Sequence, residues 1–434
     1  MPTVERTPEG IIEAVERHEQ ESDALRNRQD ADYSLFRLDG YDAGDDYESY
    51  TSNEPRTYAD KIVSWLGSAE LTVRIPVAQH QREKREINDK KERFILGVIR
   101  AADDHLRRML QLPLQDQLGW HIAMRGWYAG RALLVRDEDE NGISTTHIDI
   151  TPFDPRHTFW GVGARGVDWV CHRTRLTPVD IKSQYDVDVA AGGSVTDESG
   201  IDVYDFYDSE TNVVVIENQV LKEATPHGAN RVPCFLGPVP TGPLILTEQL
   251  TDTSAGHGES IYASARDIYE SHNKVMSTML ELVERARKQG VKVFSRDGSK
   301  TLDEDPYKAG TELALSTGNE DVVPLGMLEI AKETGAFMGL VSGELQRATL
   351  PHSAFGELQF QLSGFAITQL RQGIETVLQP RVKAMENCYK DISELLTEQY
   401  GSGLYDEVEL SGQDQNHEYF SERMDPFEIQ QGGD

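Results

Sequence analysis

The fold of this chain is decided by the stretch IYASARDIYESHNKVMSTMLELVERA, residues 261–286. Its apolar or small residues, together with one histidine, recur at alternating steps of four and three residues. They are Ile261, Ala265, Ile268, His272, Val275, Met279, Leu282 and Ala286. Eight consecutive matches predict a helix of about 30 residues, about 45 Å long, with one continuous packing face. Within this face we interpret His272 as a packed or interface histidine and not as a metal ligand.

Beyond the predicted helix the chain becomes locally basic and then helical again. Six bases and one acid lie within residues 285–300, in a chain whose net charge is −31. The stretches Val291–Phe294 and Thr311–Leu315 have the composition of short strands around a polar loop. A second helix is predicted up to Arg347. It carries glycines at four-residue spacing, which indicate close approach of a neighbouring backbone: Gly335, Gly339 and Gly343.

A third, long helix is predicted from Glu357 to Tyr400, with a kink at Pro380. The connector before it, residues 348–356, contains a proline that cannot continue the preceding helix, and it ends in a flexible glycine. Residues 401–434 hold nine acids and a single base, Arg423. This composition predicts a weakly ordered tail.

The region before the decisive helix changes from helical to strand periodicity. Residues 1–60 hold 16 acids and 6 bases, and include a short amphipathic stretch, Ile11 to Leu25. Two helices are predicted on either side of Pro113. The predicted strands that follow are Arg131–Val135, Ile143–Ile150, Val167–Leu176, Ile201–Asp208, Val213–Glu217 and Arg231–Leu236. A short capped helix is predicted at Thr177-Pro178-Val179-Asp180. The fold class is therefore α+β.

Composition excludes several classes of protein. No apolar run approaches the roughly 18 residues of a membrane span, and the first residues predict no secretory signal. The cysteines fit no metal spacing, and we expect free thiols: Cys171, Cys234 and Cys388. The high negative charge disfavours sequence-specific DNA binding, although a channel wall that avoids phosphate contacts would suit sliding DNA.

The search for catalytic motifs gives little. Gly161-Val-Gly163-Ala-Arg-Gly166 matches a nucleotide-binding pattern, but a strand and not a helix is predicted after it, so we interpret it as a loop between strands. The chain has no P-loop, HExxH or GxSxG motif. A polar cluster could be drawn as a metal site, although no third ligand is forced toward the first two members: His147, Asp149, Asp154, His157 and His172. We expect no enzyme activity, no cofactor and no metal.

The order of these segments resembles the portal proteins of tailed double-stranded DNA bacteriophages over nearly the whole chain. The strings behind the resemblance are Ile148-Asp-Ile-Thr-Pro-Phe-Asp-Pro-Arg-His157, Leu176-Thr-Pro-Val-Asp180, Val203-Tyr-Asp-Phe-Tyr207, Val220-Leu221, Arg231-Val-Pro233 and Ser363-Gly-Phe-Ala-Ile367. The resemblance implies a portal-like fold with an α/β wing, a two-helix stem, a small α/β clip and a long kinked crown helix. The implied parts are an acidic N-terminal segment (1–60), the wing (61–258), the first stem helix (259–289), the clip (290–325), the second stem helix (326–347), the tunnel loop (348–356), the wing/crown helix (357–400) and an acidic C-terminal tail (401–434).

The resemblance also implies functional positions. The oligomer seam would be formed by Ile261, Ile268, Val275, Met279, Leu282, Gly335, Gly339 and Gly343. The partner-facing bases of the clip would be Lys292, Arg296 and Lys300. The DNA-facing residues of the tunnel loop would be Arg347, Thr349, Leu350, Pro351, His352 and Ser353.

The implied function is a homo-oligomeric ring, a dodecamer, at the portal vertex of the virion, made in the host cytoplasm. DNA would pass through it without sequence specificity during packaging and ejection. The implied partners are the terminase, a head–tail adaptor and the major capsid protein, with no membrane. Two alternatives remain open at this point: another ring-forming head–tail structural protein, and a metal-dependent hydrolase.

Overall fold

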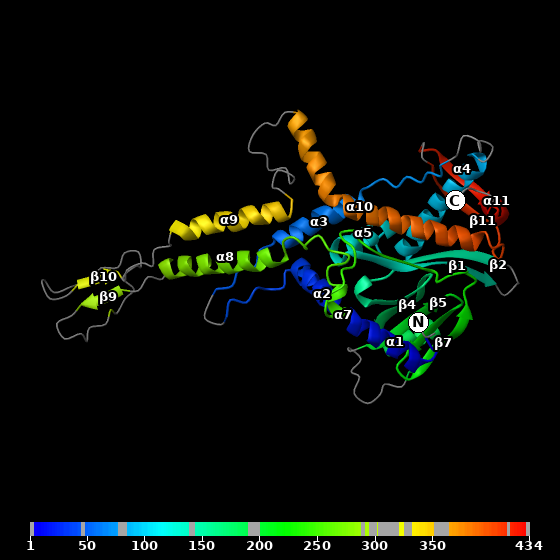
Figure 1. Ribbon diagram of the computed structural model, residues 1–434, viewed down its shortest axis with the longest axis horizontal. Helices are drawn as coiled ribbons and strands as arrows, with labels where there is room; N and C mark the ends of the chain where they lie inside the picture. The colour runs from blue at the N-terminus through cyan, green and yellow to red at the C-terminus, as the bar shows by residue number, and fades with distance from the viewer. Residues whose placement is uncertain are drawn as a thin grey trace. The chain divides into compact units, whose positions relative to one another are not determined.

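The computed structural model describes residues 4–44, 48–76, 85–138, 144–189, 200–287, 291–294, 302, 321–324, 332–350, 364–414 and 417–430. Helices and antiparallel sheets alternate along the chain, which confirms the α+β class (Figure 1). Two compact units form. The first contains residues 1–36, 57–263 and 358–434, and the second contains residues 37–56 and 264–357.

Helices of the first unit lie before, between and after its strands. They are α1 (Pro8–Glu21), α2 (Asp23–Arg37), α3 (Glu54–Gly67), α4 (Arg85–Arg108), α5 (Leu114–Arg125), α6 (Pro178–Tyr185), α7 (Leu250–Thr253), α10 (Gly364–Tyr400) and α11 (Pro426–Gln430). The predicted cap of α6 is confirmed, because the Thr177 hydroxyl accepts from the backbone N–H of Asp180 and the Asp180 carboxylate accepts in return.

Three antiparallel sheets belong to the first unit. Their strands are β1 (Trp127–Glu138), β2 (Ser144–Pro152), β3 (Thr158–Gly163), β4 (Gly166–Leu176), β5 (Ile201–Asp208), β6 (Thr211–Ile216), β7 (Gln219–Pro226), β8 (Cys234–Pro238), β11 (Val408–Gln413) and β12 (Tyr419–Met424). The strand orders are β2-β1-β8, β3-β4-β5-β6-β7 and β11-β12. All six strands predicted from the sequence are present, with ends that differ by a few residues.

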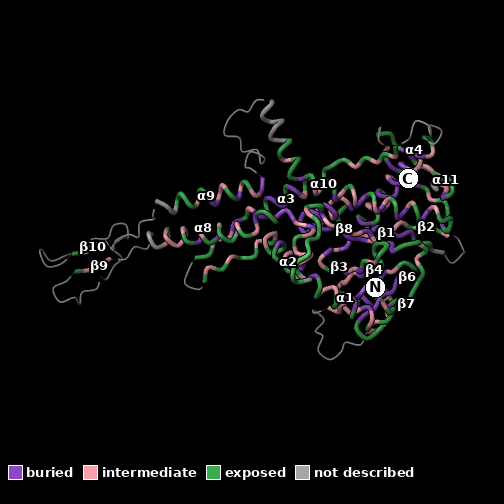
Figure 2. The backbone as a smooth tube through the Cα atoms, in the orientation of Figure 1, coloured by how far each residue is buried: buried purple, intermediate pink, exposed green. Residues whose placement is uncertain are grey.

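The five-stranded sheet is covered on both faces, which explains the fully buried run of β6. On one face Ile11 and Val15 of α1 pack with Phe159, Phe206 and Val215. Side chains on the other face contribute to two further clusters, one of which includes Ile181 of α6. Burying apolar side chains on both faces removes the alternation of polar and apolar residues expected of a half-exposed strand. Figure 2 shows this buried backbone in the region of the sheets.

The long helix α10 packs on the three-stranded sheet. Its side chain Gln399 completes the edge of β1: the amide nitrogen donates to the Ala132 carbonyl, and the amide oxygen accepts from the Leu134 N–H. Pro380, where a kink was predicted, lies inside the helix, and the helix bends partway along its length (Figure 1). The predicted start at Glu357 lies outside the described residues.

The prediction of a weakly ordered C-terminal tail is wrong for the described residues. Strands β11 and β12 form a hairpin on α4, and α11 follows it. Leu410, Met424 and Ile429 are buried. The acidic composition concealed this order, because the acids lie between apolar residues that alternate toward α4.

The described residues of the second unit include two helices and a pair of antiparallel strands. Its elements are α8 (Arg266–Arg287), β9 (Val291–Phe294), β10 (Asp321–Pro324) and α9 (Lys332–Ala348). Helices α8 and α9 lie side by side, and β9 pairs antiparallel with β10 (Figure 1). Helix α8 begins seven residues later than the predicted start at residue 259. The predicted strand Thr311–Leu315 lies outside the described residues, and the partner of β9 is a strand that the sequence analysis did not predict.

Candidate functional site

The predicted seam divides at the start of α8. Ile261 precedes the helix in the first unit, is buried, and donates its N–H to the Ala123 carbonyl. The four later members lie along α8 in the second unit and are only partly buried: Ile268, Val275, Met279 and Leu282. The side chain of His272, in the same stripe, is also partly buried, and its Nδ1 has no hydrogen-bond partner.

The buried face of α8 is a different and more polar one. Tyr269, Asn273 and Ser277 are buried there, about 140° around the helix axis from the predicted seam. An apolar pattern could not indicate this face, because its members are mostly polar.

An extended stretch, residues 48–52, runs antiparallel along this polar face. The backbone N–H groups of Glu48, Tyr50 and Ser52 donate to side chains four residues apart on α8: Glu281 at 3.4 Å, Ser277 at 2.8 Å and Asn273 at 3.0 Å. Two residues of extended chain span about 6.7 Å and four residues of helix span about 6 Å, so the two periods match.

The same stretch is tied back to the chain that precedes it. The Ser49 hydroxyl accepts from the Ala43 N–H, and the Thr51 hydroxyl accepts from the Tyr41 N–H. We call residues 39–44 and 48–53 the strap. No apolar pattern in the sequence indicates that it docks on α8.

The glycine stripe of α9 faces open space. Gly335 and Gly339 are exposed and Gly343 is partly buried. A Cβ atom built on any of the three would meet no heavy atom within 4 Å. Within a single chain, nothing in the described structure requires glycine at these positions.

A second exposed flank of α9 is apolar. Phe337 and Leu340 expose 52% and 62% of their surface, while Val341 and Leu345 are buried. At 100° per residue, the buried stripe lies between the glycine stripe and the Phe337–Leu340 flank around one side of the helix. One flank is therefore hollow and the other protrudes.

Of the predicted tunnel loop (348–356), the structure describes the first residues, 348–350. Arg347 is exposed and forms an ion pair with Glu344 at 2.9 Å. Thr349 and Leu350 are buried, so in this conformation they offer little surface to a ligand. The other predicted loop positions, Pro351, His352 and Ser353, lie outside the described residues.

One of the three predicted clip bases is described. Lys292 is exposed on β9, opposite Val323 of β10. Arg296 and Lys300 lie outside the described residues.

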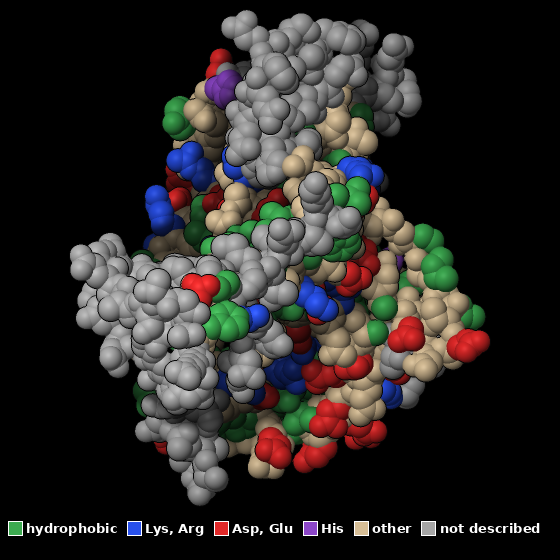
Figure 3. Space-filling model, turned by 90° about the vertical axis from the view of Figure 1, so that its left-hand side faces the viewer, with side chains coloured by type: hydrophobic (Ala, Val, Ile, Leu, Met, Phe, Trp, Pro, Cys, Tyr) green, Lys and Arg blue, Asp and Glu red, His purple; other side chains and the backbone are tan. Residues whose placement is uncertain are grey.

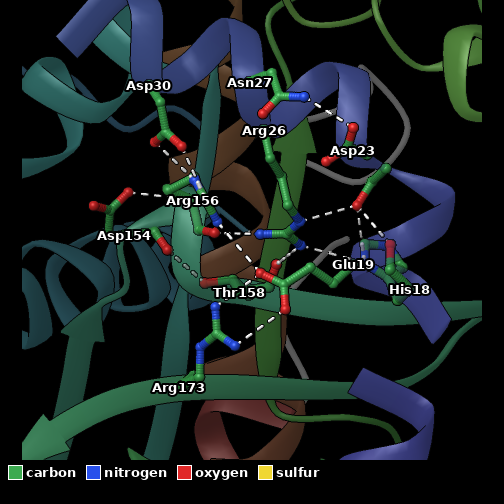
Figure 4. A network of polar contacts seen from close by, with 11 residues as sticks. His18, Glu19, Asp23, Arg26, Asn27, Asp30, Asp154, Arg156, Thr158 and Arg173 are labelled. Carbon is green, nitrogen blue, oxygen red and sulfur yellow. Dashed lines mark hydrogen bonds and ion pairs between the residues drawn. The ribbon is translucent and has the colours of Figure 1, made fainter. Parts of the chain in front are cut away.

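A buried polar network in the first unit was not predicted (Figure 4). Its centre is Arg26 of α2, which exposes 3% of its surface. Its guanidinium donates to the carbonyls of Arg156 and Thr158 and to the Ser22 hydroxyl, and it lies 4.2 Å from the Phe159 ring centroid. Burial, together with neighbouring arginines, lowers the pKa of Arg26 to about 9, which leaves it protonated at neutral pH.

The carboxylates around Arg26 are matched by arginines. Glu19 accepts two hydrogen bonds from Arg173, at 2.9 and 3.1 Å. Asp30 accepts two from Arg156, at 2.8 and 2.9 Å. The first forked pair attaches α1 to β4 of the five-stranded sheet, and the second attaches α2 to the short 3₁₀ helix Pro155–His157.

A further forked pair joins α5 to the short 3₁₀ helix Pro155–His157. Asp154, just before that helix, accepts from Arg125 at 2.8 and 3.0 Å. Arg125 and Gln29 also exchange side-chain to backbone hydrogen bonds. The signal in the sequence was a polar stripe on α2 at helical spacing, formed by Arg26, Gln29 and Asp32, which are all buried.

The motifs weighed as enzymatic sites have structural roles. The glycine pattern at residues 161–166 spans the hairpin between β3 and β4, as predicted. In the metal candidate, Asp149 pairs with Arg131 at 2.9 Å and Asp154 with Arg125. The described residues contain no group of three or more side chains placed to hold a metal ion.

The free cysteine thiols were predicted from the sequence. All three cysteines are free, with Cys171 and Cys388 buried and Cys234 partly buried. Acidic and basic side chains both lie on the face shown in Figure 3, among atoms that are not described. No helix in the described ranges is both long and apolar enough to cross a bilayer.

No protein-family model matches the chain, and a comparison with curated proteins likewise finds no match.

Proposed function

We propose that this chain is a protomer of a portal ring, the channel through which the genome of a tailed bacteriophage enters and leaves its capsid. The observation that carries the proposal is the pair of dissimilar flanks on α9. One flank is hollow at Gly335, Gly339 and Gly343, and the other protrudes at Phe337 and Leu340. A ring needs such a pair, because each protomer presents one surface to the neighbour on one side and a different surface to the other.

The partly buried seam of α8 supports the same proposal. Ile268, Val275, Met279 and Leu282 form an apolar stripe that a single chain covers only in part. Exposed apolar area on a helical arm indicates a protein partner. In a ring, the neighbouring protomer would cover the rest of this stripe.

Charge is consistent with DNA as a passenger. At −31 per chain, a ring would repel DNA at long range and offer few tight phosphate contacts. In the proposed ring, Arg347 and the loop after it would face the channel. Lys292, Arg296 and Lys300 would lie on the clip and meet the terminase during packaging and the adaptor afterwards.

The proposed protein is not an enzyme and needs no cofactor. The forked arginine–carboxylate pairs of the first unit support this, because they give Glu19, Asp30 and Asp154 a structural role. The major capsid protein would hold the ring at one vertex of the virion.

Mass photometry and electron microscopy of the purified protein test the proposal. We expect rings with a protruding stem and a mass of about 580 kDa for twelve copies of the 48.7 kDa chain. Val275→Asp should reduce assembly, because it places a charge in the seam. A small ring would favour an adaptor. A compact monomer across protein and salt concentrations would contradict the proposal.

A further inference from the structure

A run of three exposed apolar side chains follows the last strand of the three-stranded sheet. Leu244, Ile245 and Leu246 expose 58%, 62% and 81% of their surface. They lie in a connection without helix or strand, and residues 238–247 carry no charge. Consecutive exposed apolar residues are costly in water and are typical of a segment that docks on a protein.

A groove of about 1160 Å³ lies elsewhere in the same unit. One wall is the α10 face from Glu386 to the helix end, continuing to Ser402, and the other is the extended stretch 71–76. In Figure 1 this stretch is the blue trace that runs along α10. The described residues place it in none of the four sheets.

The interior of the groove has apolar positions. Leu71, Val73 and Ile75 are partly buried while the residues between them are exposed, so the apolar side chains of this extended stretch point toward the protein. Tyr389 and Ile95 also line the groove. An apolar segment laid along it would therefore meet apolar side chains.

The exposed run together with its flanking residues, Pro243–Glu248, agrees in length with the groove. Six residues of extended chain span about 20 Å, which applies both to stretch 71–76 and to Pro243–Glu248. The helical wall from Glu386 to Tyr400 spans about 21 Å. The charged side chains of the lining, four bases and three acids, nearly balance, which suits a segment with the single charge of Glu248.

We propose that residues 243–248 of one protomer dock in the groove of a second copy. The segment does not line the groove of its own chain, and both features belong to one compact unit. A contact between two different surfaces of identical chains propagates in one direction, and it closes into a ring when the rotation between neighbours returns to the first chain. The inference rests on the proposed ring and adds a second contact to it, independent of α8 and α9.

The test uses two full-length variants with opposite defects. One variant makes the docking segment polar: Leu244→Ser/Ile245→Ser/Leu246→Ser. The other, Ser393→Trp, fills the groove. Each should lower the ring fraction at micromolar concentration by about tenfold or more, as expected for loss of a buried apolar anchor. Val179→Ser changes an exposed apolar residue of α6 and should assemble like the wild type. Lys390→Trp, at an exposed groove position, replaces Ser393→Trp if the latter does not fold.

Mixing the two variants gives the decisive measurement. A 1:1 mixture restores one intact segment–groove contact for each pair of unlike protomers, so it should contain more dimers of about 97 kDa than either variant alone. The inference would be overturned if the variants form rings like the wild type, or if the mixture of folded variants stays monomeric. In both cases wild-type rings would still support the proposed function. A monomeric wild type would overturn both.

Discussion

Arg26 shows how a charged residue can hold two elements together from inside a protein. Its guanidinium satisfies two carbonyls and one hydroxyl that are remote from water, and it stacks on Phe159. Removing the donor leaves these acceptors buried without partners, which costs more than the hydrogen bonds contribute when present.

We predict that Arg26→Met lowers the free energy of unfolding by about 2–4 kcal/mol, from the unpaired acceptors and the lost cation–π contact. Urea denaturation measures the change. The matched control is Asn27→Ala on the exposed side of the same helix turn, expected within about 0.5 kcal/mol of the wild type. Equal effects of the two substitutions would show that the network does not stabilise the fold.

Three histidines make stability depend on pH. Burial lowers the pKa of His18 and His172 to about 3 and that of His121 to about 4, from 6.5 in the unfolded chain. Below pH 6.5 the unfolded chain therefore binds protons that the folded chain does not. The free energy of unfolding should fall as pH drops from 6.5 toward 3–4, by at most about 1.4 kcal/mol per pH unit for each histidine.

Thermal unfolding between pH 4 and 8 checks this prediction. His172→Phe keeps a ring against Phe153, on which the imidazole stacks at 4.1 Å, and should reduce the slope of stability against pH. His417→Gln removes an exposed imidazole and serves as the control. An unchanged slope in the His172 variant would contradict the assignment.

At the scale of elements, α9 separates the stability of the chain from its assembly. Each helical glycine costs about 0.5–1 kcal/mol relative to alanine, and the three glycines face open space in the single chain. In the proposed ring, a neighbour that approaches the backbone closely would account for these glycines.

We predict that Gly335→Ala/Gly339→Ala/Gly343→Ala raises the helical stability of the single chain by about 1–3 kcal/mol in total and weakens ring formation. Circular dichroism of the dissociated chain and mass photometry of the assembled one measure the two effects. Ala336→Gly, in the same helix, should lower helicity and leave the glycine stripe intact. Stronger assembly in the triple variant would contradict a close contact at this stripe.

Elements with a clear period were predictable from the sequence, and elements stabilised by polar contacts were not. The three- and four-residue spacing of α8 and the Val, Tyr and Phe content of β5 predicted those elements, because helix period and strand propensity are local properties of the sequence. The buried residues of α2 include Arg26 and Gln29, which donate to backbone carbonyls more than 90 residues away. Such partners are fixed only by the tertiary fold, so neither this network nor the docked strap could be predicted. For the candidate site, the sequence indicated the glycine stripe but not the protruding flank opposite it.

At the scale of the whole molecule, charge would oppose the proposed assembly. Each protomer carries −31, and a ring of twelve would bring these charges together. The apolar flanks and seam would have to overcome a repulsion that salt screens over a Debye length of about 10 Å at 0.1 M.

We predict that the ring fraction rises between 50 and 500 mM NaCl at fixed protein concentration, because screening weakens the repulsion and leaves apolar burial intact. Mass photometry across a salt series measures it. Rings that dissociate as salt increases would show instead that ion pairs dominate the interface.

The ladder between the strap and α8 has a mechanical consequence. Its three hydrogen bonds follow one another along the helix axis. A pull on one end of the strap, perpendicular to that axis, would load them one after another, and the strap would peel at low force. A pull along the helix axis would load all three together and meet greater resistance. The direction of an applied force, and not the number of bonds, would thus decide whether the strap stays attached.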